Sequence, residues 1–146
     1  MESIKDYKKL IAFLDVIHLH WPKGNFMPSE FFHSDTAEKL GISNFPDDQR
    51  ILINLLNLIN NILVPVRKRI NMPITISSGY RCFQLNTAVG GAARSYHMEG
   101  RAVDIYCANL KALDDAIVAV NEANLKAHRP VLKEFIRYKN FIHIAL

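Results

Sequence analysis

The chain has 146 residues, of which 49% are hydrophobic and 22% are charged. This length and composition are typical of one folded domain with its own core, and they exclude a disordered or low-complexity protein. The formal net charge is +4, but the lysines and arginines are scattered along the chain. We therefore expect no specific nucleic-acid partner. We treat residues 1–146 as a single domain and expect it to be a monomer.

Export and disulfide signals are weak. Cys82 and Cys107 are too few for a disulfide framework, so we expect two reduced thiols. Asp15 and His18 interrupt the apolar stretch near the N-terminus, which therefore does not match a secretory signal. No run approaches about 18 consecutive apolar residues, so no transmembrane segment is expected. These features predict a protein that is cytoplasmic as synthesised.

The N-terminal part is predicted to be helical. Apolar residues recur at helical spacing over residues 3–19, and Pro22 follows as a stop. A short helix is expected to follow Asp35, whose side chain caps it while Glu38 closes a capping box, and to end at Gly41.

The middle of the chain changes from a helical to a strand pattern. Residues 49–70 are apolar on most sides, which predicts a buried central helix that Pro65 kinks or ends. The segments 74–78 (ITISS) and 101–107 (RAVDIYC) read as strands. The glycine-punctuated segment 79–100 connects them, and connections of this length inside a domain are usually functional.

The C-terminal part predicts one more helix and a hairpin. The helix covers residues 109–124, and strands follow at 131–138 and 141–146, with a turn near Lys139 and Asn140. Helices come first and an antiparallel sheet comes later, so the predicted fold class is α+β.

Three polar residues interrupt this pattern in a way that indicates a metal site. Asp104 and His143 each point to the opposite face from their aliphatic neighbours on a predicted strand, so they meet if the two strands are adjacent. His97, in the preceding loop, is separated from Asp104 by a bend at Gly100. Two imidazoles and one carboxylate with an open position make a catalytic zinc site. On spacing alone, solvated or hydrogen-bonded histidines explain the pattern as well. The remaining histidines are assigned no ligand role: His18, His20, His33 and His128.

The stretch ITISSGYRCFQLNTAVGGAARSYHMEGRAVDI, followed by FIHIAL, resembles the M15 family of zinc D,D-peptidases in its short phage and bacterial branch. The shared pattern is SGYR, LN, VGG, SxHxxGxAxD, and a last strand with an aromatic residue, one residue, and histidine. The upstream SEFFHSDTAEKLGISNFP is similar to the N-terminal portion of that branch. The resemblance implies a hedgehog/D,D-peptidase-like fold in which N-terminal helices pack on a small antiparallel sheet.

The resemblance also implies roles for single residues. It implies that His97, Asp104 and His143 bind Zn²⁺ and that Arg81 is a catalytic and substrate-binding residue facing the substrate carbonyl or carboxylate. A guanidinium suits either group because it offers fixed paired donors. Ser95 is a candidate substrate-binding residue or loop-shaping residue, although a hydroxyl bonded to its own backbone explains it equally well.

The general base is where the sequence departs from its relatives. Several branches place Asp or Glu three residues before the last histidine, where this chain has Asn140, which cannot exchange a proton near neutral pH. Others carry a glutamate where this chain has Tyr138. Glu134 is the candidate catalytic carboxylate, and Glu99 is a second. Either one of these supplies the base, or the metal acts with Arg81 alone, or the protein binds without cleaving.

The function implied by the resemblance is hydrolysis of peptidoglycan stem peptides. The enzyme would be a D,D-carboxypeptidase cutting D-Ala-D-Ala or an endopeptidase cutting L-Ala-D-Glu, with bacterial peptidoglycan peptides as its partners. A phage or prophage endolysin fits, acting at the cell wall after release during lysis. The alternative is a non-catalytic zinc- or peptidoglycan-binding module that keeps the metal site without an efficient base.

Overall fold

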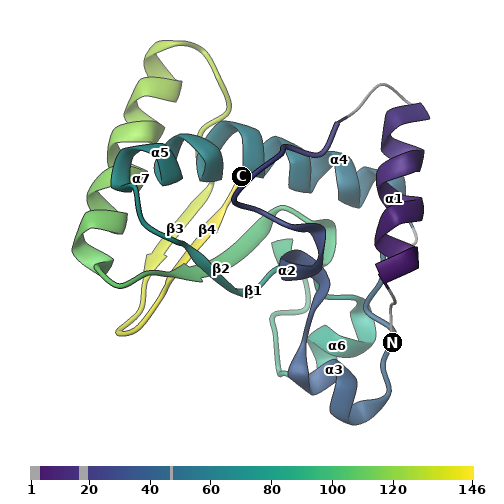
Figure 1. Cartoon of the computed structure of the whole chain (residues 1–146). Coiled ribbons are helices and arrows are strands. Elements are labelled where there is room, and N and C mark those ends of the chain that lie inside the picture. The colour runs from purple at the N-terminus through teal and green to yellow at the C-terminus, as the bar shows by residue number, and fades with distance from the viewer. Residues whose placement is uncertain (1–3, 17–19, 47) are drawn as a thin grey trace.

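The structure is a computed structural model that describes residues 4–16, 20–46 and 48–146. It confirms the α+β class, with helices on one face of a four-stranded antiparallel sheet (Figure 1). The strand order is β1-β2-β4-β3. The strands are β1 (Thr75–Ser78), β2 (Ala102–Tyr106), β3 (Glu134–Arg137) and β4 (Ile142–Ala145). The helices are α1 (Ile4–Val16), α2 (Pro28–Phe32), α3 (Asp35–Leu40), α4 (Gln49–Leu58), a π-helical segment (Ile59–Leu63), α5 (Val64–Ile70), α6 (Phe83–Ala88), a 3₁₀ turn (Tyr96–Glu99) and α7 (Leu110–Lys126).

The N-terminal helices follow the prediction with one correction. Helix α1 occupies most of the predicted 3–19 range, while residue 3 and residues 17–19 lie outside the described residues. Helix α3 begins at Asp35 but is capped by Ser34, whose hydroxyl accepts the N–H of Ala37 at 3.2 Å. The predicted cap by Asp35 is therefore wrong, because the backbone of Ser34 has the extended conformation of a cap. The Asp35 carboxylate contacts His33 instead, at 2.9 Å.

Pro65 does not end the central helix, which continues from α4 through the π-helical segment into α5. Proline has no N–H, so it cannot donate to the carbonyl of Asn61 four residues earlier. The side-chain amide of Asn124, from α7, donates to that carbonyl at 2.9 Å. Asn124 is buried, with 2% of its surface exposed. This hydrogen bond fixes α7 to the central helix at the point where Pro65 interrupts the backbone pattern.

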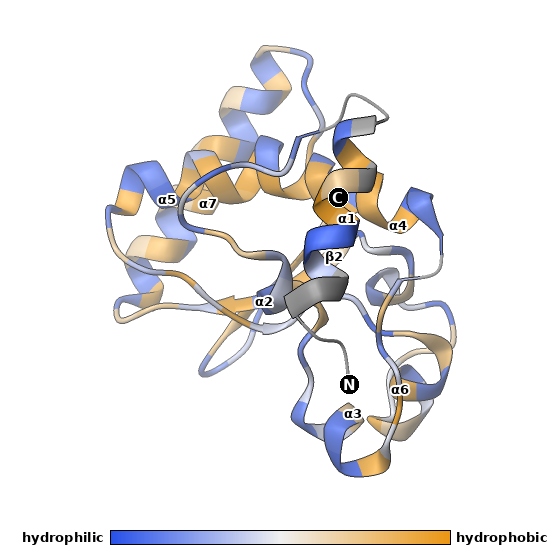
Figure 2. Cartoon of the chain, turned by 45° about the vertical axis from the view of Figure 1, so that its right-hand side comes forward, coloured by the Kyte–Doolittle hydropathy of each residue, from blue (hydrophilic) through white to orange (hydrophobic). Residues whose placement is uncertain are grey.

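The central helix, Gln49–Ile70, is also long and apolar enough to cross a membrane, a test that core helices of soluble proteins pass as well. Half of its most apolar window is buried inside the domain. Leu55, Leu58 and Ile62 are fully buried and belong to one cluster with sheet residues. Figure 2 shows the apolar stretches of this helix in orange. We interpret it as the core helix that the sequence predicts.

The core lies between the helices and one face of the sheet. Val103 and Ile105 of β2 and Ile142 and Ile144 of β4 are at most 2% exposed and pack in the core. Burying an aliphatic side chain of this size stabilises the fold by about 1.5–3 kcal/mol. Because successive side chains on a strand alternate, the residues between these aliphatics point to the other face. That face is where the functional groups lie.

The register of the sheet brings the predicted groups together. Strands β2 and β4 are antiparallel neighbours, and Asp104 pairs directly with His143. Strands β3 and β4 form the predicted hairpin, closed by a hydrogen bond from Tyr138 N–H to Phe141 C=O at 2.9 Å. The turn therefore falls at residues 139–140, as predicted.

Candidate metal centre and active site

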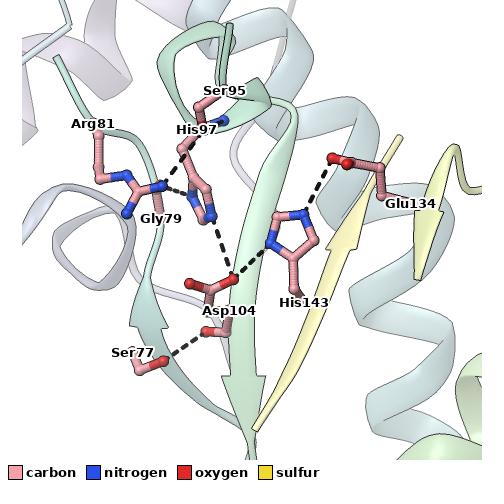
Figure 3. A network of polar contacts seen from close by, with 8 residues as sticks. All are labelled: Ser77, Gly79, Arg81, Ser95, His97, Asp104, Glu134 and His143. Atoms are coloured by element: carbon pink, nitrogen blue, oxygen red, sulfur yellow. Dashed lines mark hydrogen bonds and ion pairs between the residues drawn. The ribbon is translucent and has the colours of Figure 1, made fainter. Parts of the chain in front are cut away.

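Three potential metal ligands converge on the open face of the sheet (Figure 3). The Asp104 Oδ1 atom lies 2.8 Å from Nδ1 of His143 and 3.3 Å from Nε2 of His97. His97 comes from the 3₁₀ turn that precedes β2, and it is 1% exposed. One ligand atom from each residue lies within 4.8 Å of the others. The juxtaposition predicted from the alternation of the two strands is present.

The second nitrogen of each histidine is also held by an oxygen. Nδ1 of His97 lies 2.7 Å from the carbonyl of Gly79, and Nε2 of His143 lies 3.2 Å from Oε1 of Glu134. Carbonyls and carboxylates only accept hydrogen bonds, so these outer nitrogens donate. A neutral imidazole then turns a lone pair from its inner nitrogen toward the Asp104 oxygen. A cation between the three groups satisfies both lone pairs and the carboxylate.

The donor set and its spacing fit zinc. Two imidazole nitrogens and one carboxylate oxygen are ligands of catalytic zinc sites, which keep one position open. Tetrahedral ligands about 2.0–2.1 Å from zinc lie roughly 3.3 Å from one another, which is close to the separations of Asp104 from the two histidines. The outer hydrogen bonds to Gly79 and Glu134 set the tautomers that leave the inner nitrogens free for a metal.

The electrostatics of the group favour a charged Asp104. Burial raises the pKa of Asp104, but His143 and His97 in their protonated forms donate hydrogen bonds to it and add positive charge, which outweighs burial and holds that pKa well below its usual value. The hydrogen bond with Asp104 raises the pKa of His143, partial burial opposes this, and the contact with Glu134 adds to the rise. Asp104 is thus a potential metal ligand that carries a negative charge at neutral pH.

Arg81 lies beside this group, in the connection between β1 and α6. Its Nη2 donates to the hydroxyl of Ser95 at 3.4 Å (Figure 3). Burial lowers the pKa of Arg81, and the negative charge of Asp104 partly opposes this; the guanidinium remains charged, as arginines in proteins do. Ser95 also accepts the backbone N–H of His97 at 3.2 Å and caps the 3₁₀ turn. The Ser95 hydroxyl therefore links the guanidinium to the turn that carries a ligand.

These groups line one cavity of about 510 Å³. Its wall includes the three potential ligands together with Arg81, Arg94, Ser95, Glu134 and Tyr138. Arg81 and Arg94 offer this wall donors for an anionic group, and Asp104 and Glu134 balance their charge.

Comparison with known proteins agrees with this geometry. The family model described as Peptidase M15 matches residues 24–145. The chain belongs to the M15 peptidase family. Peptidases of this family are metalloenzymes, and the His–Asp–His group is a candidate metal centre within the matched region. A comparison with curated proteins found no match.

The structure separates the candidate bases of this M15 peptidase. Glu134 and Asp104 are the carboxylates that line the cavity among the described residues. Glu99 lines a different cavity, of about 640 Å³, and lies 3.7 Å from Arg101. Asn140 is exposed in the turn between β3 and β4 and is not part of the cavity wall. The geometry therefore favours Glu134 over Glu99.

One further histidine of this M15 peptidase has acidic neighbours that sequence spacing did not reveal. His33 lies 2.9 Å from Asp35 and 3.6 Å from Glu38. All three side chains are exposed. We assign no metal to this group.

Gly100 sets the bend between His97 and Asp104. Its φ is +69°, and a Cβ atom there would lie 2.6 Å from the carbonyl oxygen of Ile51. Gly100→Ala is expected to cost about 1–2 kcal/mol for the left-handed backbone and more for the clash, measured by urea unfolding. Gly41 has φ +66° with no atom within 4 Å, so Gly41→Ala is the control. Equal losses for both variants would contradict the close approach to Ile51.

Sequence reasoning missed two groups at this site. The Gly79 carbonyl orients His97, and a Cβ at Gly79 would lie 2.4 Å from the Phe31 carbonyl oxygen. The glycine of SGYR is the only sequence signal for this contact. Arg94, in the cavity wall, has no distinguishing spacing.

Helix α6 was also missed inside the 79–100 connection, because its cap is Cys82, whose sulfur accepts the Leu85 N–H at 3.4 Å.

Proposed function

We propose that this M15 peptidase is a zinc enzyme that hydrolyses peptide bonds in peptidoglycan stem peptides. The observation that carries the proposal is the convergence of His97, Asp104 and His143 at one cavity that also contains Arg81 and Glu134. Membership of the family supports the reaction class. The substrate class is our inference from the family and from the two arginines in the cavity wall.

The ligand atoms are assigned from the hydrogen bonds. His97 Nε2, Asp104 Oδ1 and His143 Nδ1 would hold zinc, since the other nitrogen of each histidine is already used. When bound, zinc lowers the pKa of water and polarises a carbonyl. Gly79 and Glu134 keep the two rings oriented toward that position.

Arg81 has the geometry to bind the reacting oxygen or a substrate carboxylate. Its guanidinium presents several N–H donors in a fixed plane, and the link to Ser95 places it at the cavity wall. Arg94 adds a second positive charge. Stem peptides carry free carboxylates, which the guanidinium groups of Arg81 and Arg94 can bind through paired N–H donors. The two candidate bonds are D-Ala-D-Ala and L-Ala-D-Glu, which give different products.

We assign the proton transfer to Glu134. Its carboxylate lies in the cavity and is held through His143. Glu134→Gln keeps an oxygen that can accept from His143 but cannot take up a proton, so kcat is expected to fall by about 10²–10⁴ with full zinc content. Steady-state kinetics and metal analysis check this.

Asn140→Asp is the matched control for this assignment. It places a carboxylate in the exposed turn outside the cavity wall, so activity is expected to stay at the wild-type level. A gain in activity for this variant, or near-normal kcat for Glu134→Gln, would assign the base to another group.

The proposed function is tested by metal analysis combined with mass spectrometry of digested cell-wall fragments. Release of D-Ala identifies a carboxypeptidase, and new L-Ala carboxyl ends identify an endopeptidase. Full zinc occupancy without cleavage of either bond would reject the enzyme and favour the binding module.

A further inference from the structure

Asn44 is a buried polar residue in the segment between α3 and α4, far in sequence from the site. It is 1% exposed. Its Nδ2 donates to the carbonyls of Tyr80 at 2.8 Å and Phe32 at 3.1 Å, and its Oδ1 accepts the backbone N–H of Cys82 at 2.8 Å. The amide therefore uses both of its ends on backbone groups, and two of these groups flank Arg81 directly.

The opposite side of the same segment is fixed by His97. The Arg81 N–H donates to the carbonyl of His97 at 3.1 Å, and the Gly79 carbonyl accepts from the His97 ring at 2.7 Å. A further bond, from Tyr80 N–H to Phe31 C=O at 2.8 Å, ties the segment to α2. Residues 79–82 are thus clamped between Asn44 and His97.

We propose that Asn44 is a positioning residue that sets the location of the Arg81 guanidinium relative to the ligand group. This rests on the proposed function, in which Arg81 contacts the substrate. If the Asn44 amide is removed, the Tyr80 carbonyl and the Cys82 N–H each lose a hydrogen bond. A backbone group that is buried without a partner is unfavourable, so the segment is expected to rearrange. A displacement of about 1 Å in a group that contacts the reacting atoms costs on the order of 100-fold in rate.

The chain contains a matched control. Asn124 is 2% exposed, and its amide also makes three hydrogen bonds, to the Asn61 carbonyl at 2.9 Å, the Pro130 carbonyl at 3.1 Å and the Arg129 guanidinium at 3.1 Å. None of these partners lines the cavity. Replacement of either asparagine by alanine removes three hydrogen bonds of a buried amide, but only Asn44 contacts the segment that carries Arg81.

The kinetic test compares Asn44→Ala with Asn124→Ala. Both variants are expected to lose similar stability in thermal unfolding and to retain zinc. We expect kcat/KM to fall roughly 10- to 100-fold for Asn44→Ala and to stay near the wild-type value for Asn124→Ala. In an Arg81→Ala background the further effect of Asn44→Ala should be small, because the two residues act through one group. Additive losses, or equal losses for the two asparagines, would overturn the proposal.

A second measurement does not depend on activity. The Nε of Arg81 is buried, without a hydrogen-bond partner among the described residues, so its N–H signal in a ¹⁵N NMR spectrum reports the position of the side chain. Arg81→Lys identifies the signal. We expect the signal to shift or broaden in Asn44→Ala but not in Asn124→Ala, and an unchanged signal in Asn44→Ala would overturn the proposal. If the wild-type protein cleaves no stem peptide, the proposed function fails while this measurement still decides the position of Arg81.

A milder pair of variants covers the case in which Asn44→Ala does not fold. Serine keeps a hydroxyl that reaches fewer partners than the amide does, so Asn44→Ser and Asn124→Ser are compared in the same two measurements. We expect both serine variants to fold. Only Asn44→Ser should lower kcat/KM and shift or broaden the NMR signal of the Arg81 Nε–H group. Failure of both Asn44 variants to fold, while both Asn124 variants fold, would overturn positioning in favour of a purely structural role.

Discussion

His97→Ala and Asp104→Ala are each expected to abolish hydrolysis and to weaken zinc binding by more than about 100-fold, because loss of a direct ligand exceeds the effect of losing an outer hydrogen-bond partner. Asp104 is the centre of the group, since its Oδ1 faces both histidines. Its removal leaves two imidazoles with ring centroids 5.2 Å apart and no carboxylate between them. Zinc content after dialysis and cleavage of cell-wall fragments measure both effects.

The control for these variants is a histidine outside the cavity. His128 is exposed and has φ +55°, a backbone conformation that asparagine tolerates. His128→Asn should therefore retain zinc and activity. Normal zinc content in Asp104→Ala would contradict the ligand assignment, whatever the activity of that variant.

Arg81→Ala is expected to lower kcat by about 10²–10³ while zinc content stays unchanged, because in the proposed reaction it removes donors that stabilise the developing oxyanion. Arg81→Lys keeps the charge but not the paired donors, so we expect only partial recovery. Arg50→Ala is the control. Arg50 is exposed, its guanidinium lies 2.8 Å from the carboxylate of Asp48, and it does not line the cavity of the metal centre. A rise in KM with unchanged kcat would instead show that Arg81 binds substrate and transition state equally.

The sequence predicted the parts of the site that depend on strand alternation. Asp104 and His143 each follow an aliphatic residue whose side chain must be buried. Because neighbouring side chains on a strand point to opposite faces, both residues were expected on the face away from the core, whichever strands are paired. His97 could be placed at the loop, and its neighbour Gly100 explained the bend. The pairing of β2 with β4 completed the group.

The features that could not be predicted depend on contacts between distant segments. Asn44 lies 36 residues before Tyr80, and no local pattern shows that its amide meets that carbonyl. The continuation of the central helix past Pro65 depends in the same way on Asn124, 63 residues after Asn61. Local sequence rules describe the backbone preference of proline, but they do not include a partner supplied by another helix.

The position of β4 inside the sheet affects how the protein is synthesised. Because β4 is the later strand in the chain yet lies between β2 and β3, the sheet cannot close until residues up to Ala145 have left the ribosome. His97 and Asp104 are synthesised before His143, so the three candidate ligands can come together only after β4 has been made. A chain that has been synthesised only as far as β3 therefore lacks the third candidate ligand of the group.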